Sequence, residues 1–114
     1  MGLDQHAVAR KDGEEDVELM YWRKHSSLEG FMSALYELKG GDKEFNCEEV
    51  ELDEVDLELL EKMVKEGTLP ETKGFFFGPG KEFDHEYLDD DVLFIGKARE
   101  YLHDGFKIVY SSNW

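Results

Sequence analysis

The sequence lacks the features that mark secreted and membrane proteins. Cys47 is the only cysteine among 114 residues, so no disulfide can form within the chain and a reducing compartment is the simpler expectation. The first residues contain no apolar stretch of signal-peptide length, and no apolar run approaches the roughly 20 residues of a membrane span. We therefore expect a cytoplasmic protein that does not associate with membranes.

Positive charge is also scarce. The chain has 13 Lys and Arg against 28 Asp and Glu, which gives a formal net charge of −15. The range 42–66 alone holds eleven acids and three lysines. A field of this sign repels nucleic acid and anionic membranes and favours basic partners. Direct binding of nucleic acid is therefore not expected.

Recognisable reaction motifs are missing. The glycine-rich range 74–81 has one residue too many between its glycines for a Walker phosphate loop, and Lys81 is followed by glutamate. The histidines show no HxH or HxxxH spacing, and no EF-hand pattern occurs. Cys47 is followed by two glutamates, which disfavour a reactive thiolate. We expect no cofactor, no metal and no catalytic residue.

Hydrophobic periodicity predicts a folded chain all the same. Hydrophobic residues make up 40% of it and aromatic residues 13%, which argues against disorder. Strands are predicted at residues 3–10, 16–23, 44–50 and 106–111, and the range 74–78 suits either a strand or a loop. Helices are predicted from Ser26 or Ser27 up to Gly40, between Asp53 and Gly67, and over about residues 87–103. This order indicates a single α+β domain over residues 1–114, a mostly antiparallel sheet with about three helices packed on one side.

The helical patterns also predict which side chains are buried. The first helix should bury Leu28, Phe31, Met32, Leu35 and Leu38, and the second Leu57, Leu60 and Val64, widened by Leu59 and Met63. The third should bury Leu88, Val92, Ile95 and Leu102. Asp89–Asp91 should form a solvated start of the third helix, where acids suit the helix dipole.

An acidic stripe occurs at Glu51, Glu54, Glu58 and Glu61, spaced three, four and three residues apart. If the second helix starts early enough, these side chains share one face. Such a ladder can imitate a phosphate backbone and occupy a nucleic-acid-binding protein. It is equally the pattern of a solvated helix face opposite a buried stripe.

Aromatic rings beside cations or hydroxyls are the most distinctive pattern that is present. They occur in the ranges 20–25, 69–78 and 108–114. Where the open end of the predicted hairpin approaches the last strand, we predict a ligand-binding pocket. Its residues are Asp4, Tyr21, Arg23, Lys24, His25, Ser111 and Trp114. Asp4 would orient Arg23, and Tyr21 and Trp114 would supply contact area, unless the group is only an ion pair with ordinary aromatic packing.

The same segments resemble a family of small proteins encoded by bacteriophages and prophages. The similarity lies in Met1–Asp4, in Tyr21–Lys24 and the following helix start, in Leu69–Gly78, and in the terminal Ser-Ser-x-Trp. Some members carry the label phosphoglycerate kinase. That activity does not fit a chain of this length without a nucleotide loop, and Lys73 stands where the family pattern has a serine. The resemblance implies a phage origin, and hence an accessory role in the infected host cell.

Three functions remain open. The first is a phage accessory protein that binds a small anionic ligand or a host protein segment through the predicted pocket. The second is an acidic inhibitor, or DNA mimic, of a basic host protein. The third is a small hydrolase or transferase acting on a phosphorylated metabolite, with His25 or His85 as the general acid–base. A homodimer through an exposed sheet edge is a reasonable default.

Overall fold

The computed structural model describes residues 3–69 and 86–114. The chain opens with a hairpin of β1 (Asp4–Arg10) and β2 (Val17–Arg23). Gly13 lies in the connecting turn with φ of 83°, a conformation that glycine adopts at little cost. The predicted hairpin is confirmed, with Asp4 opposite Arg23 at its open end.

Helix α1 (Ser26–Leu38) and helix α2 (Glu54–Glu66) follow the predicted bounds. Asp53 caps α2 in a reciprocal capping box with Asp56, and Gly67 ends the helix in the left-handed conformation. Helix α3 (Leu88–His103) completes the set. The predicted cap is confirmed for α2. The predicted serine cap of α1 is wrong, because the N-cap is His25, which makes no side-chain capping bond, and Ser26 and Ser27 lie inside the helix.

The third strand differs from the prediction. Strand β3 (Glu49–Leu52) begins later than the expected range 44–50, because Cys47 has a φ of 63° that is incompatible with extended backbone. Strand β4 (Lys107–Asn113) extends beyond the predicted range 106–111. The range 74–78 lies outside the described residues.

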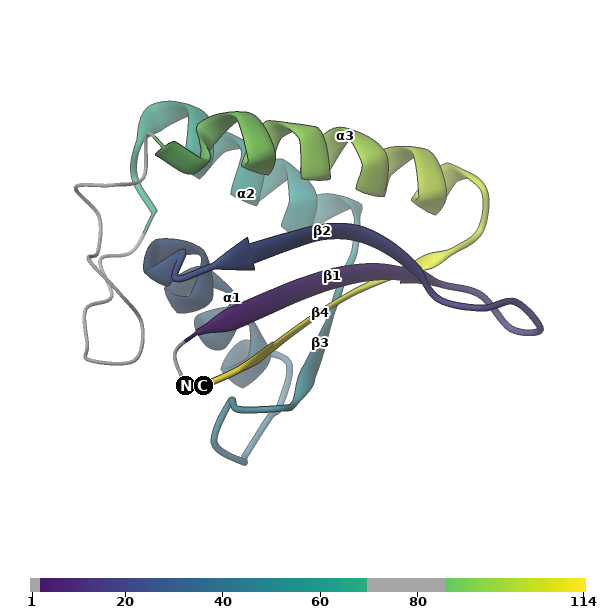
Figure 1. Ribbon diagram of the computed structural model, residues 1–114, viewed down its shortest axis with the longest axis horizontal. Coiled ribbons are helices and arrows are strands. Elements are labelled where there is room, and N and C mark those ends of the chain that lie inside the picture. The colour runs from purple at the N-terminus through teal and green to yellow at the C-terminus, as the bar shows by residue number, and fades with distance from the viewer. Residues whose placement is uncertain (1–2, 70–85) are drawn as a thin grey trace.

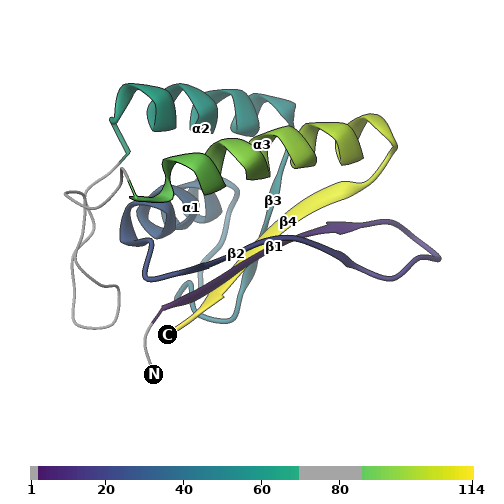
Figure 2. The same cartoon turned by 45° about the horizontal axis from the view of Figure 1, so that its top comes forward.

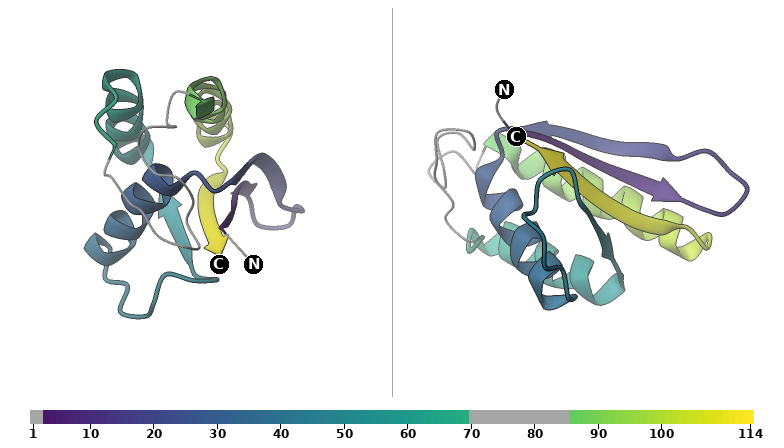
Figure 3. Two further views of the ribbon diagram at one scale, coloured as in Figure 1. Left: turned by 60° about the vertical axis from the view of Figure 1, so that its left-hand side comes forward. Right: turned by 90° about the horizontal axis from the view of Figure 1, so that it is seen from below.

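The strands form one antiparallel sheet in the order β2-β1-β4-β3. All the described helices cover one face of this sheet, and the other face is open (Figures 1 and 3). Helices α2 and α3 run side by side across the covered face (Figure 2). Helix α1 begins where β2 ends and packs against β3. The predicted α+β class is therefore confirmed. Strands β2 and β3 form the two edges, and a homodimer through either of them stays a prediction.

The core fills the space between the sheet and the helices. Trp22 of β2 packs edge-on against Phe94 of α3 at 5.1 Å between ring centroids and lies 6.2 Å from Tyr110 of β4. The stripe Leu57, Leu60 and Val64 is buried as predicted.

Some predicted core positions are wrong. Leu38 and Leu59 are exposed. Helix α3 buries Ile95 as predicted, but Phe94 and Ala98 are buried with it while Leu88 and Val92 are exposed. The sheet packs against a different side of α3 from the one that its most obvious apolar residues suggested. None of the helices in the described parts of the chain is long and apolar enough to cross a membrane.

Candidate functional site

The sheet separates the residues that we predicted to form one pocket. Gln5, Trp22 and Ser112 are buried against the helices, so their strand neighbours Asp4, Arg23 and Ser111 point to the open face. Tyr21 is on the open face as well, opposite His6 in the register. His25 and Trp114 lie on the helix side, and Lys24 forms the bend between β2 and α1 with φ of 60°.

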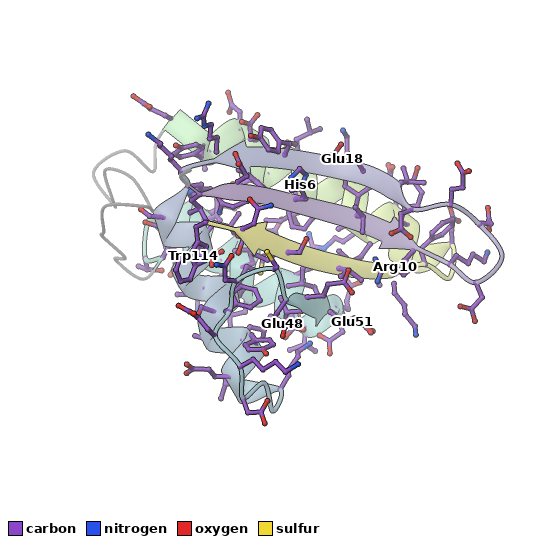
Figure 4. All side chains as sticks on the ribbon, turned by 60° about the horizontal axis from the view of Figure 1, so that its bottom comes forward. His6, Arg10, Glu18, Glu48, Glu51 and Trp114 are labelled. Carbon is purple, nitrogen blue, oxygen red and sulfur yellow. The ribbon has the colours of Figure 1, made fainter. Side chains whose placement is uncertain are left out.

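Several polar side chains of the open face pair with one another, among them His6 with Glu18 (labelled in Figure 4). The Tyr21 hydroxyl donates to the Asp4 carboxylate at 2.7 Å, and this contact raises the pKa of Tyr21. His6 lies 2.9 Å from Glu18 and contacts the Tyr21 ring. We expected Asp4 to orient Arg23, but the hydrogen bond that the structure shows for Asp4 comes from Tyr21.

Arg10 holds the other end of this face together. Its guanidinium binds both carboxylate oxygens of Glu49 at 2.9 Å and also binds Asp16. These bonds lower the pKa of Asp16 and of Glu49 and raise that of Arg10. One guanidinium is thus shared by two carboxylates, so this group of three side chains keeps one net negative charge.

A chain of buried hydrogen bonds lies on the helix side of the sheet. Gln5 donates from Nε2 to the Tyr110 hydroxyl at 2.9 Å and to the carbonyl of His25 at 3.0 Å. Tyr110 donates to Glu29 Oε1 at 2.7 Å, and Ser112 donates to Glu29 Oε2 at 3.0 Å. The network ties β1 and β4 to the start of α1.

Glu29 is the functional candidate that we did not predict from the sequence. It is only 2% exposed, and burial raises its pKa from 4.5 to about 7, although hydrogen bonds from Tyr110, Ser112 and Trp114 oppose the rise. A carboxyl group with such a pKa exchanges its proton near neutral pH. The available signal was its position three residues before Met32, on the apolar face of α1.

Glu29 lines a cavity of about 460 Å³ that we name the Trp114 cavity. Its walls come from α1, from residues 43–45 and from Trp114 at the end of β4. The Trp114 indole donates to the Phe45 carbonyl at 3.1 Å, and the Trp114 backbone exchanges two hydrogen bonds with the Asn46 side chain. Its backbone and its ring are therefore both held in place (Figure 4 shows its position).

The charges and rings of the Trp114 cavity fit a cation. Three aromatic side chains, Tyr36, Phe45 and Trp114, line it. The charged side chains in its lining are Glu29, Glu37, Lys43 and Glu44. Lys43 lies 3.8 Å from Glu48, so part of its charge is already balanced. Aromatic faces and carboxylates both attract cations, which is the opposite sign to the ligand that we expected.

The acidic stripe is divided between two elements. Glu51 belongs to β3, and α2 begins only at Glu54. Arg99 of α3 binds both oxygens of Glu61 at 3.0 and 3.1 Å and lies 3.4 Å from Glu54. The contact with Arg99 lowers the pKa of Glu61. Two of the four carboxylates are therefore paired within the fold.

A second buried cluster surrounds His25. Its Nε2 lies 2.8 Å from Asp91 Oδ2, and the Trp22 indole donates to Asp91 Oδ1 at 2.9 Å. The Tyr87 ring stacks on the His25 ring at 4.1 Å, and its hydroxyl donates to the Arg23 carbonyl. The prediction that Asp91 is solvated is wrong, since it is 2% exposed and anchors α3 to β2 and α1.

His25 itself is 0% exposed, so a substrate reaches it only if its surroundings move. His85, the other histidine that we considered as a general acid–base, lies outside the described residues. Within residues 3–69 and 86–114, no group of three or more His, Cys, Asp or Glu side chains has the geometry of a metal site. No family model matches this chain, and comparisons with curated proteins and with solved structures give no match.

Proposed function

We propose that this protein acts by binding, and that the Trp114 cavity receives a basic side chain carried by a segment of a partner protein. The observation that carries this proposal is the combination of three aromatic walls with a buried carboxyl group in one cavity of about 460 Å³. If the resemblance to phage proteins reflects ancestry, the partner is a host protein.

The chemistry of the cavity supports a cationic occupant. An ammonium or guanidinium group gains from the faces of Trp114, Tyr36 and Phe45, and cation–π contacts strengthen when they are desolvated. The carboxyl group of Glu29 supplies an ionic partner at the same place. Because its pKa is about 7, a bound cation would favour its ionised form and release a proton.

Size and long-range charge support a peptide side chain over a large ligand. A cavity of this volume is at the lower end of the roughly 300–1,000 Å³ typical of small-molecule sites. The net charge of −15 would raise the local concentration of basic segments and speed their association, in a manner that salt suppresses.

The direct test compares two short peptides with blocked ends that differ in one residue, lysine or norleucine. We expect the lysine peptide to shift the Trp114 indole resonance of the isotope-labelled protein, and the norleucine peptide to have little effect. Trp114→Ala should abolish the shift of neighbouring resonances, whereas Tyr21→Ala, which removes an aromatic ring from the open face, should not.

Charge reversal provides the second arm of the test. Glu44→Lys, at the cavity, should weaken lysine-peptide binding much more than Glu18→Lys, which makes the same change on the open face. Equal weakening by both variants would show that binding depends on net charge alone. Equal responses to the lysine and norleucine peptides would reject a cation site.

A further inference from the structure

We propose a second site, at the N-terminus of α1, that binds a tetrahedral oxyanion such as a phosphate group. It is separate from the Trp114 cavity and takes a ligand of opposite charge. It would be formed by the residues at the β2–α1 junction, His25, Ser26 and Ser27, with Arg23 and Lys24 immediately before them in the chain.

The first observation is a set of buried polar atoms that lack partners. His25 Nδ1, Ser26 Oγ and Ser27 Oγ are each buried and make no hydrogen bond. The three residues are 0%, 2% and 0% exposed. Buried polar groups are nearly always satisfied in native structures, and each exception needs an explanation. Three exceptions on consecutive residues indicate that an acceptor-rich group belongs there.

The second observation is the helix end on which these residues lie. His25 is the N-cap of the 13-residue helix α1, and Ser26 and Ser27 are its first two residues. The N-cap side chain makes no capping hydrogen bond. A helix N-terminus presents unbonded N–H groups and a partial positive charge, and both favour an anion.

The surrounding charges also permit an anion. Arg23 and Lys24 precede the helix, and both are exposed. Two buried acids among the described residues already have hydrogen-bond partners: Asp91 accepts from Trp22 and contacts His25 Nε2, and Glu29 accepts from Tyr110 and Ser112. Both serine hydroxyls can donate to an oxyanion, and His25 Nδ1 donates when the ring is protonated, with Asp91 balancing the charge.

Tyr87 controls one approach to this cluster. Its ring stacks on His25 at 4.1 Å with an interplanar angle of 8°, and its hydroxyl holds the Arg23 carbonyl at 3.0 Å. Since His25 is fully buried, a ligand must displace a neighbour to reach it. Removing the Tyr87 ring should therefore ease entry.

The test uses inorganic phosphate and the full chain at constant ionic strength, with chloride as the reference anion. Phosphate should shift the backbone amide resonances of Ser26, Ser27 and Leu28, with saturation in the millimolar range. The double variant Ser26→Ala/Ser27→Ala should bind at least about tenfold more weakly, because two donors are lost. Ser111→Ala, which removes a hydroxyl from the open face, should bind as the wild type does.

Tyr87→Ala keeps the proposal falsifiable if the serine variants fold poorly, since it should bind phosphate at least as tightly as the wild type. No phosphate-specific shift in either the wild type or Tyr87→Ala would overturn the proposal, as would wild-type affinity in a folded double variant. Lysine-peptide binding, measured on the same samples, reports separately on the Trp114 cavity and should not depend on Ser26 or Ser27.

Discussion

The Tyr110 hydroxyl of the central strand β4 donates a 2.7 Å hydrogen bond to the Glu29 carboxylate of α1, and both side chains are buried. The pair joins the sheet to its covering layer through a group that titrates near neutrality. Burial raises the pKa of Glu29 to about 7 and the pKa of Tyr110 well above its usual value. Because Glu29 lies in the core and also lines the Trp114 cavity, its protonation should affect both the free energy of unfolding and ligand binding.

The first prediction concerns stability against pH. In the unfolded chain Glu29 has its ordinary pKa of 4.5, and in the folded protein about 7. The folded state thus holds the proton more tightly, so stability falls as pH rises from about 4.5 to about 7 and levels off above that. The loss is on the order of 3 kcal/mol.

Glu29→Gln should remove this dependence. The amide cannot ionise, and its oxygen still accepts from the Tyr110 hydroxyl. Urea unfolding at pH 5 and pH 8 should show the variant gaining stability relative to the wild type at the higher pH. The carboxylates with lowered pKa, such as Glu49 and Glu61, act in the opposite sense and only at lower pH. An unchanged difference between the two proteins at pH 5 and 8 would contradict the prediction.

The second prediction concerns Asp91, which receives the Trp22 indole N–H and lies against His25. Asp91→Ala leaves two buried polar groups without their partner, and should cost about 3 kcal/mol of unfolding free energy. Asp90→Ala, the same change at an exposed neighbour, should change stability by less than about 0.5 kcal/mol. Chemical denaturation of the two variants measures the contrast, and similar losses would refute it.

The third prediction concerns two glycines. A Cβ at Gly41 would lie within 2.4 Å of the Tyr36 ring, whereas one at Gly96 in α3 would meet no atom within 4 Å. Gly41→Ala should force the Tyr36 ring to move and so lower both stability and lysine-peptide binding. Gly96→Ala should raise stability by about 0.5–1 kcal/mol through helix propensity. Melting temperatures of both variants provide the measurement, and a Gly41→Ala protein that melts and binds as the wild type does would be inconsistent with the packing.

The fourth prediction concerns Arg10, which joins Asp16 to Glu49 across the open face. Arg10→Lys keeps the charge but loses the forked geometry, and should lower the melting temperature by a few degrees. The Asp16 and Glu49 pKa values are depressed, so this stabilisation is present above their unfolded pKa values and disappears as pH falls through the folded ones. Lys107→Ala, a change at a neighbouring position on β4, is the control. A deficit that persists at a pH low enough to protonate both carboxyl groups would argue against an ionic origin.

Local signals accounted for most of the fold. Gly13, Asp53 and Gly67 marked a turn, a helix start and a helix end where the structure has them. Strand β3 was misplaced because the positive φ of Cys47 depends on the loop around it, which no local rule encodes. Leu59 and Val92 were assigned to the core because periodicity identifies an apolar face without showing which side the sheet will cover.

The candidate site was less predictable. Strand alternation placed Tyr21 and Arg23 on one face and Trp22 on the other, as the burial of Trp22 confirms. The sequence did not show which predicted pocket residues at the end of β4 would lie on each face, because that depends on how β4 pairs within the sheet. Glu29 was overlooked, and Asp91 was expected to be solvated, for a different reason. Among the many acids of this chain, only the tertiary structure shows that Glu29 and Asp91 are buried beside hydrogen-bond donors.

The strand order has a consequence for biosynthesis. Strand β4 is the last in the sequence, yet it lies in the interior of the sheet, between β1 and β3. The nascent chain therefore cannot close its sheet until residues 107–113 have emerged from the ribosome, and until then the apolar sides of β1 and β3 lack a neighbour. Such late, long-range pairing slows folding, so the sheet should close only once β4 is available, and the unpaired strands should be vulnerable to aggregation until then.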